Sequence, residues 1–244
     1  MSEQRSTVIP AEVARFDAWS STWWDPAGPM RPLHVTNALR LAWVRDAIAR
    51  HHGGRSDLSL LDVGCGGGLM AEPLARAGLR VVGIDASAGN IGAARRHGRD
   101  VAQLDYRVGE PAVSLRPDEH FDVVLALEVV EHVDDVPAFL ARVASHVALG
   151  GLLIASTINR TARSWLLAIV GAEYVLRVLP VGTHRWQQFV TPAELDAAAM
   201  HCGLRPLQRL GMRYLPLLHR ASWTPDTSVN YLASYARPDS ETSA

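Results

Sequence analysis

A chain of 244 residues with 48% hydrophobic residues is long enough to bury the core of one catalytic domain. Its 24 basic residues nearly balance its 25 acidic ones, and a formal net charge of -1 gives no electrostatic reason to expect a nucleic-acid partner. Cys65 and Cys202 are the only cysteines, which excludes a disulfide framework and a cysteine-based metal site.

Residues 1–54 contain a cluster of aromatic side chains that we expect to be buried. Phe16, Trp19, Trp23 and Trp24 lie close together in the chain, and large aromatic side chains are usually buried. We expect a helical cap that either packs on the rest of the domain or also excludes water from a reacting centre. The amino terminus lacks the apolar core of a signal peptide, so we expect a cytoplasmic location.

Residues 55–158 have the pattern of a nucleoside-cofactor-binding core. The strand candidate 58–63 stops at a glycine cluster with the order Asp-x-Gly-x-Gly-x-Gly, which begins at Asp62. Glycines there let backbone N–H groups approach a ligand and let the chain turn into a helix. A second strand candidate, 80–85, ends at Asp85, an acid that can accept both hydroxyls of a ribose.

The spacing of the glycines favours S-adenosylmethionine over a dinucleotide. A dinucleotide fingerprint that starts at Gly64 would have its third glycine where this chain has Leu69. Asp62 suits a ligand that carries an ammonium and a sulfonium, and it would repel a diphosphate. We therefore expect Asp62, Gly64 and Gly66 to contact S-adenosylmethionine. A dinucleotide site and a plain glycine-rich turn are the alternatives.

Strand candidates recur along the chain with helical stretches between most of them. They are residues 58–63, 80–85, 104–108, 121–127, 151–157, 205–213 and 229–236. This order predicts one domain with a Rossmann-like α/β fold, a seven-stranded, mostly parallel sheet with an antiparallel edge. Ligands bind beyond the carboxyl ends of such strands, which puts Gly64, Asp85 and Glu128 on one rim. Residues 191–237 supply a helix and the last strands, and 238–244 form a tail.

Glu128, Glu131 and His132 follow the fourth strand candidate and could carry the chemistry. Spacings of three and four bring the side chains together if the segment has begun to turn helically. Two carboxylates and an imidazole would suit a divalent ion such as Mg²⁺. Alternatively, His132 is the general base, because its unperturbed pKa lies near neutrality. In a third interpretation the acid only orients the loop.

Residues 159–190 form an apolar insertion after the fifth strand candidate. At helical spacing, the charged residues Arg160, Arg163, Glu173 and Arg177 fall within one arc of roughly 140°, and the remainder is strongly apolar. The segment is too interrupted by charge to span a bilayer, but the pattern is typical of a helix that lies in a membrane interface. We expect residues 160–181 to bind anionic membrane lipid. An ordinary amphipathic helix packed on the core or on a partner subunit is the alternative.

Several motifs taken together resemble those of the ubiquinone-biosynthesis O-methyltransferase family, within the class I S-adenosylmethionine-dependent methyltransferases. In chain order they are Trp23-Trp24-Asp25-Pro26, Pro32-Leu33-His34, Asn37-x-x-Arg40, the glycine loop and Leu127 to His132. The resemblance extends from about Phe16 to about Tyr235. It implies methylation of ring hydroxyls on polyprenylated phenols and catechols, including 3-demethylubiquinol.

The resemblance also implies roles for individual residues. Arg40, Gly64, Asp85 and Leu127 would contact the cofactor, with Arg40 as a fork for the methionine carboxylate and Leu127 beside the adenine. Relatives often have an acid after the third strand to meet the adenine amine. This chain has Gly109-Glu110-Pro111-Ala112 there, so Glu110 is only a weak candidate for that contact.

The same resemblance suggests where the protein works. It implies a cytoplasmic enzyme that associates peripherally with the inner membrane of a bacterium and partners that include other ubiquinone-biosynthesis proteins. Two other functions fit the residues: an O-methyltransferase for another small phenolic or apolar acceptor, and a non-catalytic lipid-binding protein that keeps the fold.

Overall fold

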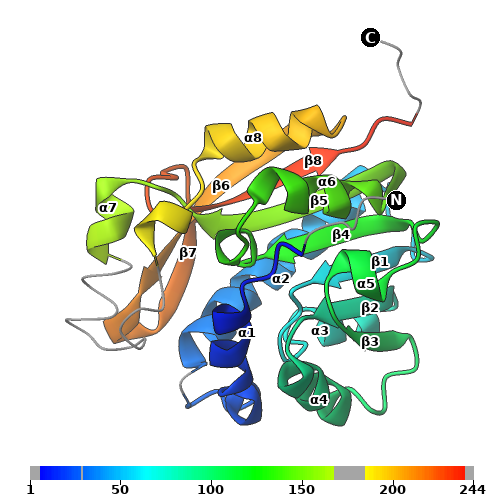
Figure 1. Ribbon diagram of the computed structural model, residues 1–244, viewed down its shortest axis with the longest axis horizontal. Helices are drawn as coiled ribbons and strands as arrows, with labels where there is room; N and C mark the ends of the chain where they lie inside the picture. The colour runs from blue at the N-terminus through cyan, green and yellow to red at the C-terminus, as the bar shows by residue number, and fades with distance from the viewer. Residues whose placement is uncertain (1–5, 29, 168–184, 240–244) are drawn as a thin grey trace.

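The computed structural model, which describes residues 6–28, 30–167 and 185–239, is built around one twisted sheet (Figure 1). Within these residues the sheet has eight strands in the order β3-β2-β1-β4-β5-β8-β6-β7. The strands are β1 Ser59–Val63, β2 Arg80–Asp85, β3 Leu104–Val108, β4 Phe121–Leu127, β5 Val147–Ile158, β6 Arg205–Leu215, β7 Arg220–Thr224 and β8 Asn230–Ala236. The first five run parallel, and β8, β6 and β7 form an antiparallel edge.

The predicted architecture is confirmed, but the expected strand count of seven is wrong by one. The additional strand is β7, which pairs only with the last part of β6, from Gly211 to Leu215. The earlier part of β6 pairs with β8 instead. β6 is therefore long enough to leave the main sheet and form a hairpin with β7. The strand is short, and its exposed Arg220 gives it little of the apolar pattern from which strands are recognised.

Two layers of helices cover the sheet. They are α1 Pro10–Asp17, α2 Arg31–His51, α3 Ala71–Arg76, α4 Ala88–His97, α5 Pro111–Ser114, α6 Val136–Ser145, α7 Ala162–Ser164 and α8 Pro192–His201, with short 3-10 turns η1 Ser20–Thr22, η2 Val130–His132, η4 Trp186–Gln188 and η5 Pro216–Leu218. One core lies between the sheet and α6 and α8, and another lies between the sheet and α2, α3 and α4 (Figure 1).

The side-chain alternation of the strands creates these two cores. In β4, Val123 and Leu125 belong to the core under α2 and α3, whereas Val124 and Ala126 belong to the core under α6. Successive side chains of a strand point to opposite faces, so a fully buried strand needs apolar residues at every position. Because helices cover both faces of the sheet, the strand ends are where polar functional groups can reach a ligand.

The predicted insertion after β5 is described only in part. α7 begins at a capping box in which Thr161 and Ser164 satisfy each other's backbone N–H groups. Of the predicted lipid-binding segment, residues 168–181 lie outside the described residues, as do residues 182–184 of the insertion and 240–244 of the tail. In the part of the chain that is described, no helix is long and apolar enough to cross a membrane.

Candidate active site

A cavity of about 610 Å³ lies at the carboxyl ends of the parallel strands, next to α1 and α2. All the site residues predicted from the sequence line this cavity. The cofactor candidates are Arg40, Asp62, Gly64, Gly66, Asp85 and Leu127, and the catalytic candidates are Glu128, Glu131 and His132. Their convergence follows from the sheet, because the ends of β1, β2 and β4 lie side by side.

The Trp23 side chain, which belongs to the cap, packs closely on the glycine loop after β1. Gly64 and Gly66 have φ values of +70° and +54°, which favour glycine. A Cβ atom on Gly66 or Gly67 would lie 2.5 or 2.4 Å from atoms of Trp23. The sequence predicted that these glycines open the backbone to a ligand. In the structure the space over Gly66 and Gly67 also receives the Trp23 side chain.

Hydrogen bonds hold this aromatic cap on the loop. The indole of Trp23 donates to Asn90 Oδ1 at 2.7 Å, and that of Trp24 donates to the carbonyl oxygen of Gly67 at 2.9 Å. Asn90 in turn donates to Asp85 at 3.2 Å. The predicted helical cap is therefore connected through Asn90 to the predicted cofactor acid.

Two acids lie behind the glycine loop, the half-buried Asp85 and the buried Asp62. Asp85 accepts hydrogen bonds from the N–H groups of Gly66 at 2.9 Å and Ser87 at 2.8 Å. Asp62 is 3% exposed, and its Oδ2 atom has no hydrogen-bond partner among the described residues. Burial, together with the charge of Asp85, raises the pKa of Asp62 to about 7. An unpaired carboxylate oxygen in this position is a natural partner for a cationic ligand group.

Arg40 reaches the cavity from α2 and is already paired. Its guanidinium Nη2 lies 2.8 Å from Glu128 Oε1, and its Nη1 donates to Asn37 at 3.2 Å. Glu128 has a φ of +55° directly after β4. Its carboxylate also accepts the Ser156 hydroxyl at 2.7 Å. The sequence placed Arg40 and Glu128 in separate roles, but the structure makes them an ion pair.

Glu131 and His132 lie in η2, and each has its own partner. Glu131 is buried and accepts the Thr157 hydroxyl at 2.7 Å. Burial, with the nearby Glu128, raises the pKa of Glu131 to about 7. His132 Nδ1 lies 3.1 Å from Glu12 Oε2. Although burial disfavours the imidazolium, the hydrogen bond to Glu12 and the surrounding carboxylates raise the pKa of His132 above its ordinary value.

These side chains do not fit a magnesium ion as they are arranged. Glu128 is turned to Arg40, Glu131 to Thr157 and His132 to Glu12. Across residues 6–28, 30–167 and 185–239, no group of three His, Cys, Asp or Glu side chains is placed to hold a metal ion. The predicted metal set of Glu128, Glu131 and His132 is therefore not supported by this geometry.

The site residues predicted from the sequence did not include Glu12, Trp23 or Asn90, although Trp23 was expected to belong to the cap. Glu12 is 4% exposed and lines the cavity. A signal in the sequence existed for Asn90, because Ser87 caps α4 and places residue 90 in its first turn. No local pattern marks a single glutamate near the amino terminus as buried. Glu110, the weak adenine candidate, accepts hydrogen bonds from the Thr7 N–H and from Arg142, both at 3.3 Å.

Known proteins match this chain over most of its length. The model of a methyltransferase domain matches residues 36–209. The ubiquinone biosynthesis O-methyltransferase of Azorhizobium caulinodans is 51% identical over 93% of this chain and 92% of its own. That of Methylobacterium nodulans is 48% identical over 93% of this chain and 94% of its own.

Solved structures agree on the fold. Magnesium protoporphyrin IX methyltransferase from Synechocystis, determined with bound S-adenosylhomocysteine, aligns with a TM-score of 0.67 at 22% identity and covers 92% of this chain and 94% of its own. The N-methyltransferase NodS from Bradyrhizobium japonicum aligns with a TM-score of 0.60 at 18% identity, over 93% of this chain and 97% of its own. With the sequence relatives, these findings show that the chain belongs to the ubiquinone biosynthesis O-methyltransferase family of class I S-adenosylmethionine-dependent methyltransferases.

Proposed function

We propose that this protein transfers the methyl group of S-adenosylmethionine to a ring hydroxyl of a prenylated phenol or catechol. The observation that carries the proposal is a single cavity that joins two kinds of chemistry. One part holds the acids and the arginine suited to a charged nucleoside cofactor, and another holds His132 and its carboxylate neighbours. Methyl transfer requires the donor and a deprotonated acceptor to meet in such a space.

The cofactor would be held through complementary charges. The unpaired Asp62 Oδ2 would receive the methionine ammonium, and Arg40 would receive the methionine carboxylate as a two-pronged donor. Asp85 would accept the ribose hydroxyls. Leu127, at the end of β4, would flank the adenine with an apolar surface.

The reaction would proceed by in-line displacement. His132 would take the proton of the ring hydroxyl at Nε2 as the hydroxyl oxygen attacks the sulfonium methyl. A carbon–oxygen bond forms, the carbon–sulfur bond breaks, and S-adenosylhomocysteine leaves with the electron pair on sulfur. Trp23 and the rest of the cap would exclude water, so that positioning supplies most of the rate enhancement.

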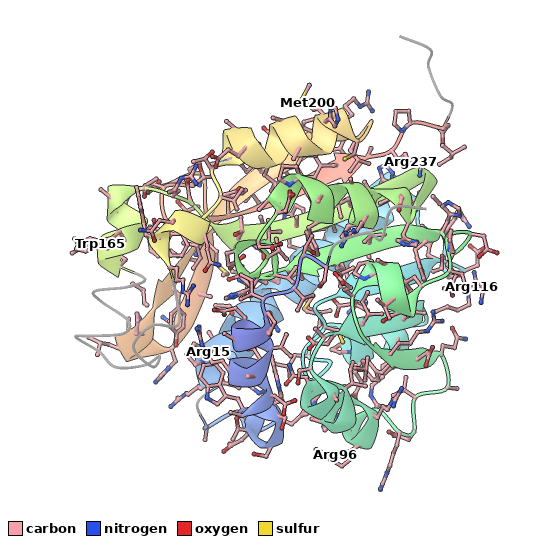
Figure 2. All side chains as sticks on the ribbon, in the orientation of Figure 1. Arg15, Arg96, Arg116, Trp165, Met200 and Arg237 are labelled. Carbon is pink, nitrogen blue, oxygen red and sulfur yellow. The ribbon has the colours of Figure 1, made fainter. Side chains whose placement is uncertain are left out.

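The opposite end of the cavity suits an apolar tail. Ile158, Leu167, Met212, Pro216 and Val229 line it. Beside it, Trp165, Leu166 and Leu167 are each about half exposed, at 47%, 53% and 48%. Figure 2 shows Trp165 projecting from the outer edge of the molecule near α7. These side chains support a peripheral contact with anionic membrane lipid, through which a prenylated acceptor would reach the cavity.

Transfer of a labelled methyl group tests the function directly. We expect the protein to methylate a short-prenyl catechol and to act poorly on the same catechol without its prenyl group. His132→Ala should lose turnover while still binding S-adenosylmethionine. Equal turnover of the two catechols would favour another small phenolic acceptor. No methylation by a protein that binds the cofactor would contradict the proposal.

A further inference from the structure

The chain near its amino terminus is fastened to the loop that carries His132. Val8 forms an antiparallel bridge with Val133, and the Asp134 N–H donates to the carbonyl oxygen of Thr7 at 3.1 Å. α1 begins two residues after this bridge, at Pro10. The first turn of α1 is thereby held against η2, although the two segments are more than 100 residues apart in the sequence.

Two side chains of α1 contact the imidazole of His132 from one face of that helix. Glu12 accepts at 3.1 Å from His132 Nδ1. Phe16, one helical turn later, meets the ring edge-on with centroids 5.1 Å apart. One contact orients the ring by a hydrogen bond and the other by packing. His132 Nε2 makes no hydrogen bond within the part of the chain that the structure describes.

We propose that Glu12 is the positioning residue of methyl transfer: its carboxylate accepts the Nδ1–H of His132, which leaves Nε2 free to take the proton of the acceptor hydroxyl. This inference rests on the proposed function, in which His132 is the base. The two ring nitrogens are distinct, and the hydrogen bond made by one decides which of them carries the proton of the neutral ring. The same carboxylate would stabilise the imidazolium formed during the reaction.

Among the described residues, neither of the other acids near His132 accepts a hydrogen bond from its ring. Glu131, its neighbour in the chain, accepts from Thr157, and Glu128 pairs with Arg40. Glu12 itself is held in place, because its second oxygen accepts from Arg15 at 2.9 Å. The hydrogen bond from His132 and the guanidinium charges of Arg15 and Arg185 hold the pKa of Glu12 below its ordinary value, against the effect of burial. The two oxygens of Glu12 thus have one donor each, Arg15 and His132.

The cap therefore takes part in the reaction, through Glu12, as well as covering the cavity. Asp62, Asp85 and Arg40, on the cofactor side of the cavity, belong to elements other than α1. Loss of the Glu12 carboxylate should therefore lower kcat and leave the KM for S-adenosylmethionine unchanged. A merely structural role for Glu12 would lower thermal stability and cofactor binding together.

The test compares Glu12→Gln, His132→Ala and the double variant in the methyl-transfer assay. Glu12→Gln should lower kcat at least about tenfold with an unchanged melting temperature, and Glu12→Asp should retain more activity than Glu12→Gln. In the double variant the Glu12 substitution should cost nothing further, because it acts through His132. Asp17→Asn is the matched control, since this α1 acid binds the Gly89 N–H at 2.8 Å and not His132. Its kcat should stay within about twofold of wild type.

The outcomes separate this inference from the proposed function. An unchanged kcat in Glu12→Gln, beside an inactive His132→Ala, would overturn the role of Glu12 and leave the methyltransferase intact. Fully multiplicative losses in the double variant would do the same. Histidine ¹⁵N chemical shifts give a readout that needs no acceptor: His132, assigned by its absence in His132→Ala, should be protonated at Nδ1 when neutral. Glu12→Gln should reduce that preference, and an unaltered shift would refute the inference even if no acceptor is turned over.

Discussion

The guanidinium of Arg40 lies 2.8 Å from a carboxylate oxygen of Glu128, so the arginine expected to bind the cofactor is paired with an acid of the chain itself. Arg40 is 4% exposed, and a charge buried to this extent needs a partner of opposite charge. A methionine carboxylate has the same chemistry as the Glu128 side chain. We therefore expect cofactor binding to exchange one carboxylate for another at Arg40.

Replacing Arg40 should weaken binding of S-adenosylmethionine selectively. Arg40→Ala removes the fork for the methionine carboxylate, and we expect the Kd measured by calorimetry to rise at least about tenfold. Arg40→Lys should be intermediate, because an ammonium cannot form the paired contacts. Methylthioadenosine, which lacks the carboxylate, should bind wild type and variants with similar Kd. A parallel loss of both ligands would contradict this role for Arg40.

The contact between Trp23 and the glycine loop predicts a compensating pair of substitutions. Gly67→Ala would place a Cβ 2.4 Å from the Trp23 side chain, and we expect a loss of about 1–3 kcal/mol in the free energy of unfolding. In a Trp23→Leu background the same substitution should cost much less. Gly66→Ala should be rescued less completely, because its φ of +54° strains any other residue. Thermal unfolding of the three single and two double variants checks this, and equal costs of Gly67→Ala in both backgrounds would contradict it.

The fold, and the meeting of Gly64 and Asp85 at one cavity, were predictable because their signals are local. The glycine spacing after 58–63 and the acid that ends 80–85 each lie within one short stretch of sequence, and the parallel sheet brings them together. The strands from Arg80, Leu104 and Phe121 have the predicted bounds. Strong apolar runs between turns carry this information without any tertiary contact.

The remaining features depend on contacts between distant segments. The partnership of Glu12 with His132 spans 120 residues, and that of Trp23 with Asn90 spans 67. Periodicity cannot reveal such a pair, and a lone acid in a cap has the same local pattern whether it is buried or exposed. The structure does not support the predicted metal role of Glu128, because this side chain pairs with Arg40. That ion pair joins distant segments and cannot be deduced from spacing in the sequence.

The ionised carboxylate of Asp62 should lower the free energy of unfolding near neutral pH and strengthen cofactor binding. Burial raises its pKa in the folded protein to about 7, from an ordinary value of 3.8. A raised carboxyl pKa contributes stability that is present in full below about pH 4 and is lost as pH rises towards 7, because the folded state then holds a proton that the unfolded state has released. Asp62→Asn does not titrate. Relative to wild type, its free energy of unfolding should thus rise between pH 4 and pH 8, by up to about 4 kcal/mol.

The measurement is chemical denaturation of both proteins, without ligand, at several pH values. Glu131 also has a raised pKa, but it is present in both proteins and cancels in the comparison. Asp62→Asn should at the same time bind S-adenosylmethionine at least about tenfold more weakly, because the methionine ammonium loses its counter-charge. A stability difference that does not change with pH would show that Asp62 is not protonated in the folded protein at neutral pH.

The exposed apolar side chains beside α7 predict a surface for membrane lipid. Changing Trp165, Leu166 and Leu167 to glutamate removes apolar area, worth of order 1 kcal/mol for each side chain, and adds charge that anionic head groups repel. We expect flotation with vesicles of anionic lipid to fall at least about tenfold. Turnover of a water-soluble short-prenyl catechol should be largely kept when only Trp165 and Leu166 are changed, because Leu167 also lines the cavity. Met200→Glu is the matched control, because Met200 is 60% exposed on α8, at a different edge of the molecule (Figure 2). Equal flotation of wild type and the triple variant would locate the lipid contact elsewhere. An equal loss in Met200→Glu, which adds only one negative charge at another edge, would show that added charge rather than these three side chains governs flotation.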